Sequence, residues 1–296
     1  MKKIRVAVLM GGKSSEREVS LSSGAEVLKN LDRDKYEVWG IDVPSELDKL
    51  GEIKPDLAFI ILHGKGGEDG VIQGYLETLG IKYTGCGVLA SAIGMNKRVF
   101  RMLMEREGIL MASETRKVPC VVKPNCGGSS VGVSIVKENK DLVTAIELAK
   151  KYDDEVIVER YIKGIEVSCG ILGDPSVNSG QVVVLPVIEI VPKKEFFDYE
   201  AKYTKGMSEE ICPARLTEKM TKKVKEITLK VFKAIDGRGY ARVDFIIKND
   251  KAYLLEINTL PGMTSNSLLP KEAKAMGVNY SQVLDKIVEL ALKTRL

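Results

Sequence analysis

One stretch of the chain, residues 240–270, restricts the possible fold more than any other part of the sequence. It begins with polar and apolar residues in alternation over 240–247, which predicts a strand with two different faces. The residues KNDK at 248–251 are typical of a turn, and a second strand is expected over 252–258. The pattern therefore predicts a hairpin.

The spacing of the polar residues predicts how the two strands pair. An antiparallel register centred on Asp250 sets Asp244 opposite Glu256 and Arg242 opposite Asn258. That register needs a loop with an odd number of residues, and we expect it at 249–251. Two carboxylates on one patch repel each other unless a cation lies between them, and oxygen ligands suit Mg²⁺.

The segment after the hairpin, Leu260 to Ser267, is the second part of this feature. Gly262 lets backbone N–H groups approach a ligand closely, and such groups attract anions. Oxygen ligands, an arginine and an anion-binding loop within thirty residues indicate phosphoryl transfer. The alternative is a surface hairpin with a polar face followed by an ordinary loop.

The first ninety residues alternate between expected strands and helices, which predicts a parallel α/β layer. Strands are expected at 4–10, 36–43 and 56–62, with helices at 14–31 and 72–79. His63, the only histidine, follows the third strand and opens a glycine-rich acidic loop. Ligands bind at the carboxyl ends of such strands, so His63 is either a binding residue or a structural one.

A glycine-rich hairpin is predicted in the middle of the chain. Residues 124–132 contain three glycines between expected strands at 118–123 and 133–136, with Lys123 at the base. The hairpin could close over phosphates, or it could be only a turn. The remaining expected elements are helices at 88–107, 141–152, 217–235 and 278–292, strands at 155–161 and 181–190, and an irregular segment at 193–214 that could act as a lid.

Composition excludes several classes of protein. The chain has 296 residues and a net charge of +4, without a block of basic residues, which argues against a nucleic-acid partner. No apolar run is long enough to span a bilayer, so no membrane partner is expected. The five cysteines are odd in number and lack a CxxC pair, which favours free thiols in a reducing cytoplasm.

Several long motifs, in order, resemble one known family. They are GGKSSEREVSLSSG (11–24), HGKGGEDGVIQG (63–74), YTGCGVLASAIGMNK (83–97), VVKPNCGGSSVG (121–132), DYEAKY (198–203), ARVDF (241–245) and LLEINTLPGMTSNSLLP (254–270). Together they resemble the ATP-grasp ligases, and within them the D-alanine–D-alanine ligases. The resemblance implies an α/β fold with three lobes: a Rossmann-like substrate domain at 1–95, a central lobe at 96–163, and a C-terminal lobe at 164–296 that carries the metal site and lid loop. ATP would lie between the two antiparallel-sheet lobes.

The resemblance also implies a reaction and a set of site residues. Two D-alanine molecules would be joined through a D-alanyl phosphate at the cost of ATP, for peptidoglycan synthesis in the cytoplasm, by a homodimer. Two Mg²⁺ ions, for which Mn²⁺ can substitute, would be held by Asp244, Glu256 and Asn258. ATP would be bound by Lys97, Lys123, Gly127, Gly128, Ser130, Glu159, Ile162, Glu166 and Lys202. The catalytic residues would be Glu16, Ser129, Tyr203, Arg242 and Gly262, with His63, Ser267 and Leu268 lining the D-alanine sites.

Two departures from the family pattern affect the central lobe. The chain between 108 and 118 is shorter than usual, which predicts the loss of a helix or strand, and Asn125 to Gly128 lacks the charged residues that usually precede the final glycine. Alternatives to the main interpretation are a D-alanine–D-lactate ligase, which Tyr203 disfavours, and another ATP-grasp carboxylate–amine ligase. A non-catalytic nucleotide sensor would be expected to lack some of the phosphate and metal residues, and none is missing.

Overall fold

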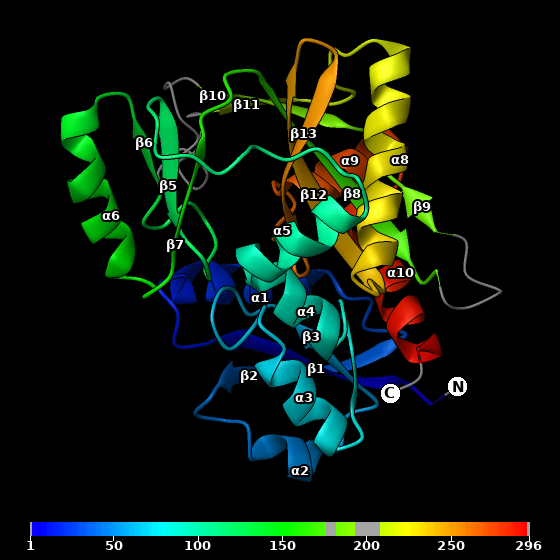
Figure 1. Ribbon diagram of the computed structural model, residues 1–296. Coiled ribbons are helices and arrows are strands. Elements are labelled where there is room, and N and C mark those ends of the chain that lie inside the picture. Colours follow the sequence, from blue (N-terminus) through cyan, green and yellow to red (C-terminus); the bar gives the residue numbers. More distant parts are fainter. Residues whose placement is uncertain (1, 176–181, 193–207, 295–296) are drawn as a thin grey trace.

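The N-terminal part of the chain is a parallel α/β layer, as predicted. The computed structural model describes residues 2–175, 182–192 and 208–294 (Figure 1). Four parallel strands lie in the order β2-β1-β3-β4. The centre of the apolar run, residues 6–9, is buried because helices cover both faces of β1. The elements of this layer are β1 (Ile4–Gly11), α1 (Arg17–Asn30), β2 (Tyr36–Val43), α2 (Lys49–Ile53), β3 (Leu57–Ile60), α3 (Val71–Thr78) and β4 (Lys82–Tyr83).

A small antiparallel sheet forms the central part, with strands in the order β6-β5-β7. One helix covers it, and their shared core is small: Cys120, Val122, Val136, Ala145 and Ala149. The elements are β5 (Cys120–Pro124), β6 (Ser134–Val136), the 3₁₀ turn η1 (Asn139–Asp141), α6 (Leu142–Lys150) and β7 (Val156–Arg160). Figure 1 shows this part standing apart from the other two, with the glycine-rich segment reaching back towards α1.

The largest sheet has the described order β11-β10-β8-β12-β13, with β9 paired to β8. Its apolar face packs on α8, with Val243 and Phe245 fully buried. The opposite face carries the polar residues of the hairpin. The elements are β8 (Ile165–Gly173), β9 (Val183–Val184), β10 (Ile188–Pro192), β11 (Ser208–Ile211), α8 (Glu218–Ala234), β12 (Gly239–Lys248), β13 (Lys251–Asn258), α9 (Leu268–Ala275) and α10 (Tyr280–Lys293).

The hairpin has the predicted register but not the predicted loop. Asp244 pairs with Glu256 and Arg242 pairs with Asn258. The turn contains two residues, Asn249 and Asp250, both with positive φ, rather than three. A β-bulge next to Asp244 supplies the missing residue, so that the pairing of the carboxylates is restored beyond it.

Three other expected elements are wrong in their extent. The helix expected at 88–107 is two helices, α4 (Val88–Met95) and α5 (Lys97–Arg106), because Asn96 leaves the helical conformation and caps α5 through Val99 N–H. The strand expected at 181–190 is interrupted between β9 and β10, where Leu185 N–H bonds to Gly170 O instead. The segment expected to be irregular contains β11, and the rest of it lies largely outside the described residues.

Candidate active site

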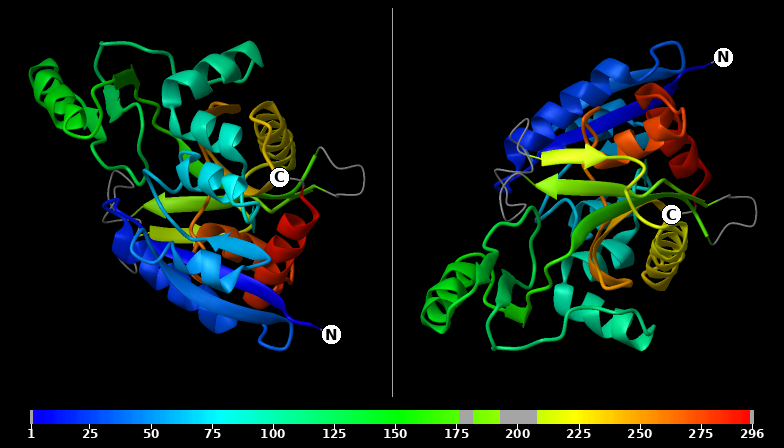
Figure 2. Two further views of the ribbon diagram at one scale, coloured as in Figure 1. Left: turned by 90° about the horizontal axis from the view of Figure 1, so that it is seen from below. Right: turned by 90° about the horizontal axis from the view of Figure 1, so that it is seen from above.

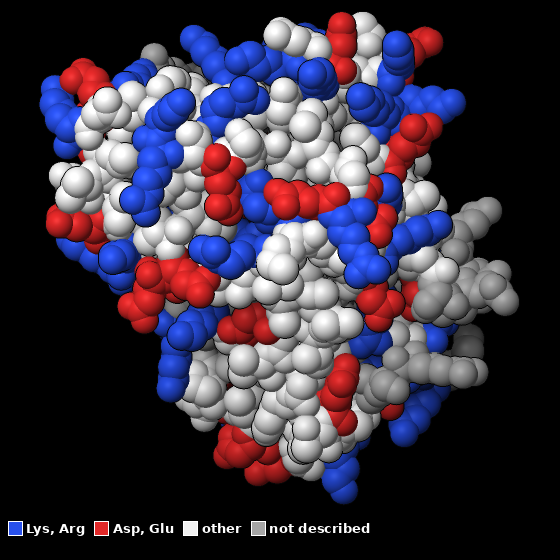
Figure 3. All heavy atoms as spheres, in the orientation of Figure 1, with Lys and Arg blue, Asp and Glu red and all other residues white. Residues whose placement is uncertain are grey.

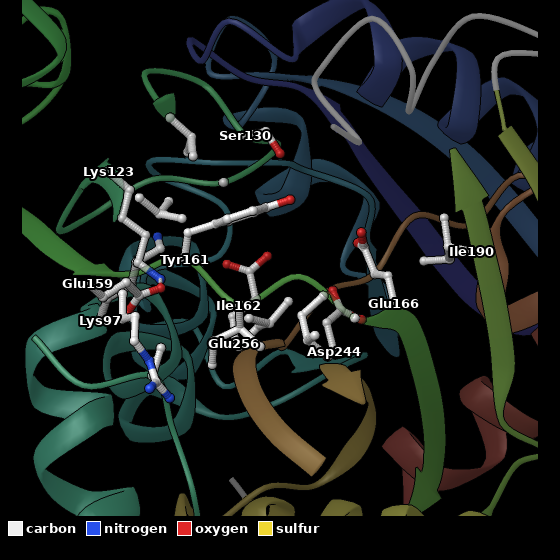
Figure 4. Close-up of a pocket in the computed structure, with 18 of the residues that line it drawn as sticks. Lys97, Lys123, Ser130, Glu159, Tyr161, Ile162, Glu166, Ile190, Asp244 and Glu256 are labelled. Atoms are coloured by element: carbon white, nitrogen blue, oxygen red, sulfur yellow. Dashed lines mark hydrogen bonds and ion pairs between the residues drawn. The ribbon is translucent and has the colours of Figure 1, made fainter. Parts of the chain in front are cut away.

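A cavity of about 380 Å³ lies between the central sheet and the large sheet. Figure 4 shows Lys97 and Lys123 on one side of it, together with Glu159, and Glu166 and Asp244 towards the other side. Lys97 and Lys123 come from the start of α5 and from β5, whereas Glu166, Asp244 and Glu256 come from β8, β12 and β13. This distribution of charge suits a ligand that carries phosphates and cations together.

The break between α4 and α5 positions the first of these lysines. Because Asn96 ends α4, the backbone N–H of Lys97 donates to Asn125 O at the start of the glycine-rich segment. The Lys97 ammonium also donates to Gly127 O at 2.5 Å. Burial lowers the pKa of Lys97, while the nearby Glu256 raises it. The lysine is therefore held beside the loop that was predicted to cover phosphates.

The second lysine belongs to a buried network. Lys123 Nζ donates to Glu159 Oε1 at 2.6 Å, and Arg101 Nη2 donates to Glu159 Oε2 at 2.5 Å. Glu159 is buried, but it still lines the cavity. Lys123 and Arg101 share one carboxylate. The Lys123 ammonium has three N–H donors and uses one of them on Glu159, so the others can reach a ligand. Arg101 was not predicted, and nothing in its local sequence distinguishes it from an exposed helical arginine.

The paired carboxylates line the cavity, and Figure 4 shows them on the same side of it. Asp244 accepts bonds from Arg242 Nε and Nη2, both at 2.8 Å, and from Ser168 Oγ at 2.5 Å. Asn258 lies opposite Arg242 on the same face of the sheet. Two carboxylates and an amide on one polar face form the oxygen donor set that Mg²⁺ prefers, so these residues fit a magnesium site.

A second group of side chains lies where the glycine-rich segment meets the N-terminal layer. Ser129 Oγ donates to Glu16 Oε1, which joins residues 113 positions apart. A Cβ added to Gly128 would lie 3.8 Å from both Glu16 Oε2 and Glu68 Oε2. The loop backbone thus passes beside two carboxylates, and Ser129 adopts a positive φ of 52° there. The structure brings Glu16 and Ser129 together, as the resemblance implied.

Glu68 was not singled out from the sequence, although the acidic glycine-rich loop that contains it was. Burial and the neighbouring Glu16 raise its pKa to about 8, and it accepts a bond from Gly64 N–H at 2.7 Å. His63 is also buried, and its Nε2 has no hydrogen-bond partner among the described residues. Burial lowers the pKa of His63, while Glu16 raises it. A neutral imidazole can donate or accept a proton in contact with a ligand.

The Gly262 loop ends at the N-terminus of α9. Thr264 N–H donates to Ser267 Oγ at 3.0 Å, and Ser267 and Leu268 begin the helix. A side chain at Gly262 would approach Ser267 Oγ to 3.2 Å, so this close turn favours glycine. Neither the loop nor Arg242 lines the 380 Å³ cavity; Arg242 lies two residues before Asp244 on the same face of β12.

The remaining predicted residues are divided between the cavity and the part of the chain outside the description. Gly127, Gly128, Ser130, Ile162 and Glu166 line the cavity. Lys202 and Tyr203 lie outside the described residues. Tyr161 and Ile190 also line the cavity and were missed (Figure 4). Tyr161 could have been suspected from its position between Glu159 and Ile162.

Comparison with known proteins gives a consistent match over the whole chain. The family model described as "D-ala D-ala ligase C-terminus" matches residues 89–289, and the model described as "D-ala D-ala ligase N-terminus" matches residues 5–52 and 45–86. A D-alanine–D-alanine ligase of Syntrophobacter fumaroxidans is 43% identical over 98% of both chains. Two crystal structures of the D-alanine–D-alanine ligase from Bacillus anthracis cover 98% of both chains: one has a TM-score of 0.87 at 40% identity, and one complexed with ATP has a TM-score of 0.85 at 38% identity.

Proposed function

This chain belongs to the D-alanine–D-alanine ligase family, and from that premise we propose how its own residues carry out the reaction. The protein is an ADP-forming ligase that joins two D-alanine molecules with the consumption of ATP, in the synthesis of cell-wall precursors. The fold is the ATP-grasp fold expected from the sequence motifs. The comparisons do not favour a D-alanine–D-lactate ligase.

We assign the 380 Å³ cavity to ATP. The observation that carries this assignment is that Asp244 and Glu256, paired across the hairpin, line the same cavity as Lys97 and Lys123. The two ammonium groups and the Gly127–Ser130 segment would hold the phosphates, with Lys202 as a further ligand by resemblance. Glu159, Ile162 and Glu166 would contact the adenine and ribose end.

We propose that Asp244, Glu256 and Asn258 hold two Mg²⁺ ions, for which Mn²⁺ can substitute. When bound, such ions neutralise the charge that builds up on phosphoryl oxygens. The chain's own contribution is to place the γ-phosphoryl group beside the first D-alanine. A carboxylate oxygen of the first D-alanine attacks the γ-phosphorus. The bond between that phosphorus and the ADP oxygen breaks, and an acyl phosphate results. Water would destroy this product, so the site must exclude solvent.

The second step uses the group of residues around the Gly262 loop. The free amine of the second D-alanine attacks the acyl carbon, phosphate leaves, and the amine loses a proton. Arg242 and Gly262 N–H would stabilise the oxyanion of the adduct, since preorganised donors are worth several kcal/mol in such a step. His63, Ser267 and Leu268 would line the D-alanine sites. Glu16, Ser129 and Tyr203 would close the site over the substrates.

The three-part division at residues 95 and 163, a homodimer, a cytoplasmic location and the absence of nucleic-acid and membrane partners remain our proposals. On the face drawn in Figure 3, basic and acidic side chains are interspersed, which suits a small-molecule enzyme better than a nucleic-acid binder. Over the described part of the chain, no helix has the length and apolar character needed to cross a membrane.

The test of this function is phosphate release from ATP with D-alanine, L-alanine or D-lactate supplied in turn. We expect release that requires D-alanine, with D-alanyl-D-alanine as the product identified by mass spectrometry. In a second assay D-alanine is limiting, and D-lactate or further D-alanine is added. If D-lactate stimulated phosphate release as strongly as D-alanine, the lactate-using alternative would be favoured. Release that depends on none of the three would contradict the proposed substrates.

A further inference from the structure

A buried carboxylate that has no role in the proposed function lies beside the face of the large sheet that carries Arg242 and Asp244. Glu272, on α9, is fully buried, and neither of its carboxylate oxygens has a side-chain hydrogen-bond partner among the described residues. A buried carboxylate without an ion-pair partner is costly, so its presence needs an explanation. Glu272 is not among the residues proposed to bind ATP, metal or D-alanine or to act in catalysis.

Gly170 shows where this carboxylate lies relative to Arg242. The two residues are directly opposite each other in the β8–β12 pair, so their side-chain positions share one face of the sheet. A Cβ added to Gly170 would overlap Glu272 Oε2. Positions opposite each other in such a pair have Cβ atoms about 5 Å apart. The Glu272 carboxylate therefore occupies the place next to the Arg242 side chain that a larger residue at 170 would fill.

Asp244 is the present partner of Arg242, and its bonding capacity is nearly used. Its Oδ1 already accepts from Arg242 Nε and Ser168 Oγ, and its Oδ2 accepts from Arg242 Nη2. Each carboxylate oxygen accepts about two hydrogen bonds. A bond from the Asp244 carboxylate to a metal ion therefore competes with its hydrogen bonds to the Arg242 guanidinium. The Arg242 side chain is only 13% exposed, so a guanidinium that loses this partner needs another anion nearby.

We propose that Glu272 is a positioning residue that accepts the Arg242 guanidinium when Asp244 binds a cation. Arg242 then has two arrangements: one on Asp244, as seen here, and one drawn towards Glu272, which leaves Asp244 free for the metal. Burial raises the pKa of Glu272 and Arg242 lowers it, so the approach of the guanidinium favours the carboxylate form. The inference rests on the proposed metal role of Asp244 and the proposed catalytic role of Arg242.

The test is direct binding of Mn²⁺ to the full-length protein with a non-hydrolysable ATP analogue, measured by electron paramagnetic resonance of free Mn²⁺. In Glu272→Gln, Arg242 stays on Asp244, and we expect Mn²⁺ affinity to fall about tenfold, the lower end of the effect of residues that support metal ligands. Glu272→Asp, which shortens the carboxylate arm, should give a smaller fall. The matched control is Glu210→Gln, because Glu210 pairs with Lys271, the neighbour of Glu272 on α9, at 2.7 Å. Its affinity should equal that of the wild type.

A second background separates positioning from a merely structural role. In Arg242→Ala, the added Glu272→Gln change should leave Mn²⁺ affinity unaltered, because the residue through which Glu272 acts is gone. An equal fall in both backgrounds, or wild-type affinity in Glu272→Gln, would overturn the inference. Wild-type protein that released no D-alanine-dependent phosphate would instead overturn the proposed function, so the two failures are distinguishable.

Discussion

Arg242 carries the most specific prediction at the level of single residues. Its guanidinium lies outside the 380 Å³ cavity but is hydrogen-bonded to Asp244, which lines it. We expect Arg242→Ala to leave the KM for ATP nearly unchanged and to lower kcat about a hundredfold or more, the usual cost of losing one oxyanion donor. Steady-state kinetics with varied ATP at saturating D-alanine would measure both. Normal turnover in this variant would refute the catalytic role.

Glu159 shows how one buried carboxylate serves stability and ligand binding together. Glu159→Gln should weaken the contacts to Lys123 and Arg101 and lower the free energy of unfolding by about 2 kcal/mol, as for hydrogen bonds to charged groups. The KM for ATP should rise severalfold because Lys123 loses its orientation. Urea denaturation and ATP titration would measure these effects. In the control Glu155→Gln, the ion pair with Arg98 is solvent-exposed, and neither quantity should change appreciably.

Glu68 gives a prediction about pH. Its pKa is about 8 in the folded protein against an ordinary value of 4.5, so between these pH values the folded protein keeps a proton that the unfolded chain has released. Its contribution to stability therefore falls as pH rises from 4.5 to 8, by at most about 1.4 kcal/mol per pH unit. In Glu68→Gln, the unfolding free energy should decline less over this range in urea titrations. Slopes equal to those of wild type would contradict the shift, and the exposed Glu226→Gln serves as control.

At the level of elements, the hairpin shows what periodicity can and cannot predict. Alternation of side chains predicted that Asp244 lies opposite Glu256, since residues paired across two antiparallel strands point to the same face of the sheet. It also predicted the wrong loop, because a bulge adds a residue without leaving a mark in the pattern. The bulge sets Leu255 and Glu256 together on the cavity side. Local sequence does not encode such irregularities, so only the fold reveals them.

The elements missed from the sequence have a related cause. The strand β8 contains IEVSCGILG, which is buried along most of its length and shows no clear alternation. The helix α9 follows a loop of turn-forming residues and is only two turns long. Most residues of the candidate site were predicted from sequence motifs. Arg101 and Glu272 were not, because their positions beside the site depend on contacts between segments far apart in the sequence.

The turn itself yields a prediction. Asn249 and Asp250 have φ values of 48° and 56°, and glycine adopts this region without the steric cost that other residues bear. Asp250→Gly should therefore raise the free energy of unfolding by about 0.5–1 kcal/mol, measured by urea denaturation, with kcat unchanged. Asp250→Val, which places a branched side chain at the same φ, should lower stability. Equal stabilities of the two variants would argue against the positive-φ turn.

At the level of the whole molecule, the C-terminal helix belongs to the core of the N-terminal layer. Leu284, Ile287 and Val288 pack with the buried residues of β1 and β3, and Figure 2 shows α10 beside that sheet. The same helix holds the Gly262 loop, because Tyr280 donates its hydroxyl to Met263 O. Lys35 and Asp285 add an ion pair at 2.6 Å. Helix α10 thus contacts both the N-terminal layer and the loop proposed to line a D-alanine site.

This arrangement predicts that damage to α10 spreads to the N-terminal sheet. Ile287 is 1% exposed, and Ile287→Ala should cost about 2–5 kcal/mol, the range for truncating a buried isoleucine. Hydrogen exchange should then accelerate at the amides of β1 and β3, although no residue of those strands is changed. The matched control is Ile146→Ala in α6, which packs on the separate central core and should accelerate exchange in β5 and β7 instead. If Ile287→Ala left β1 and β3 protected while α10 alone exchanged, the predicted coupling between α10 and the N-terminal sheet would be wrong.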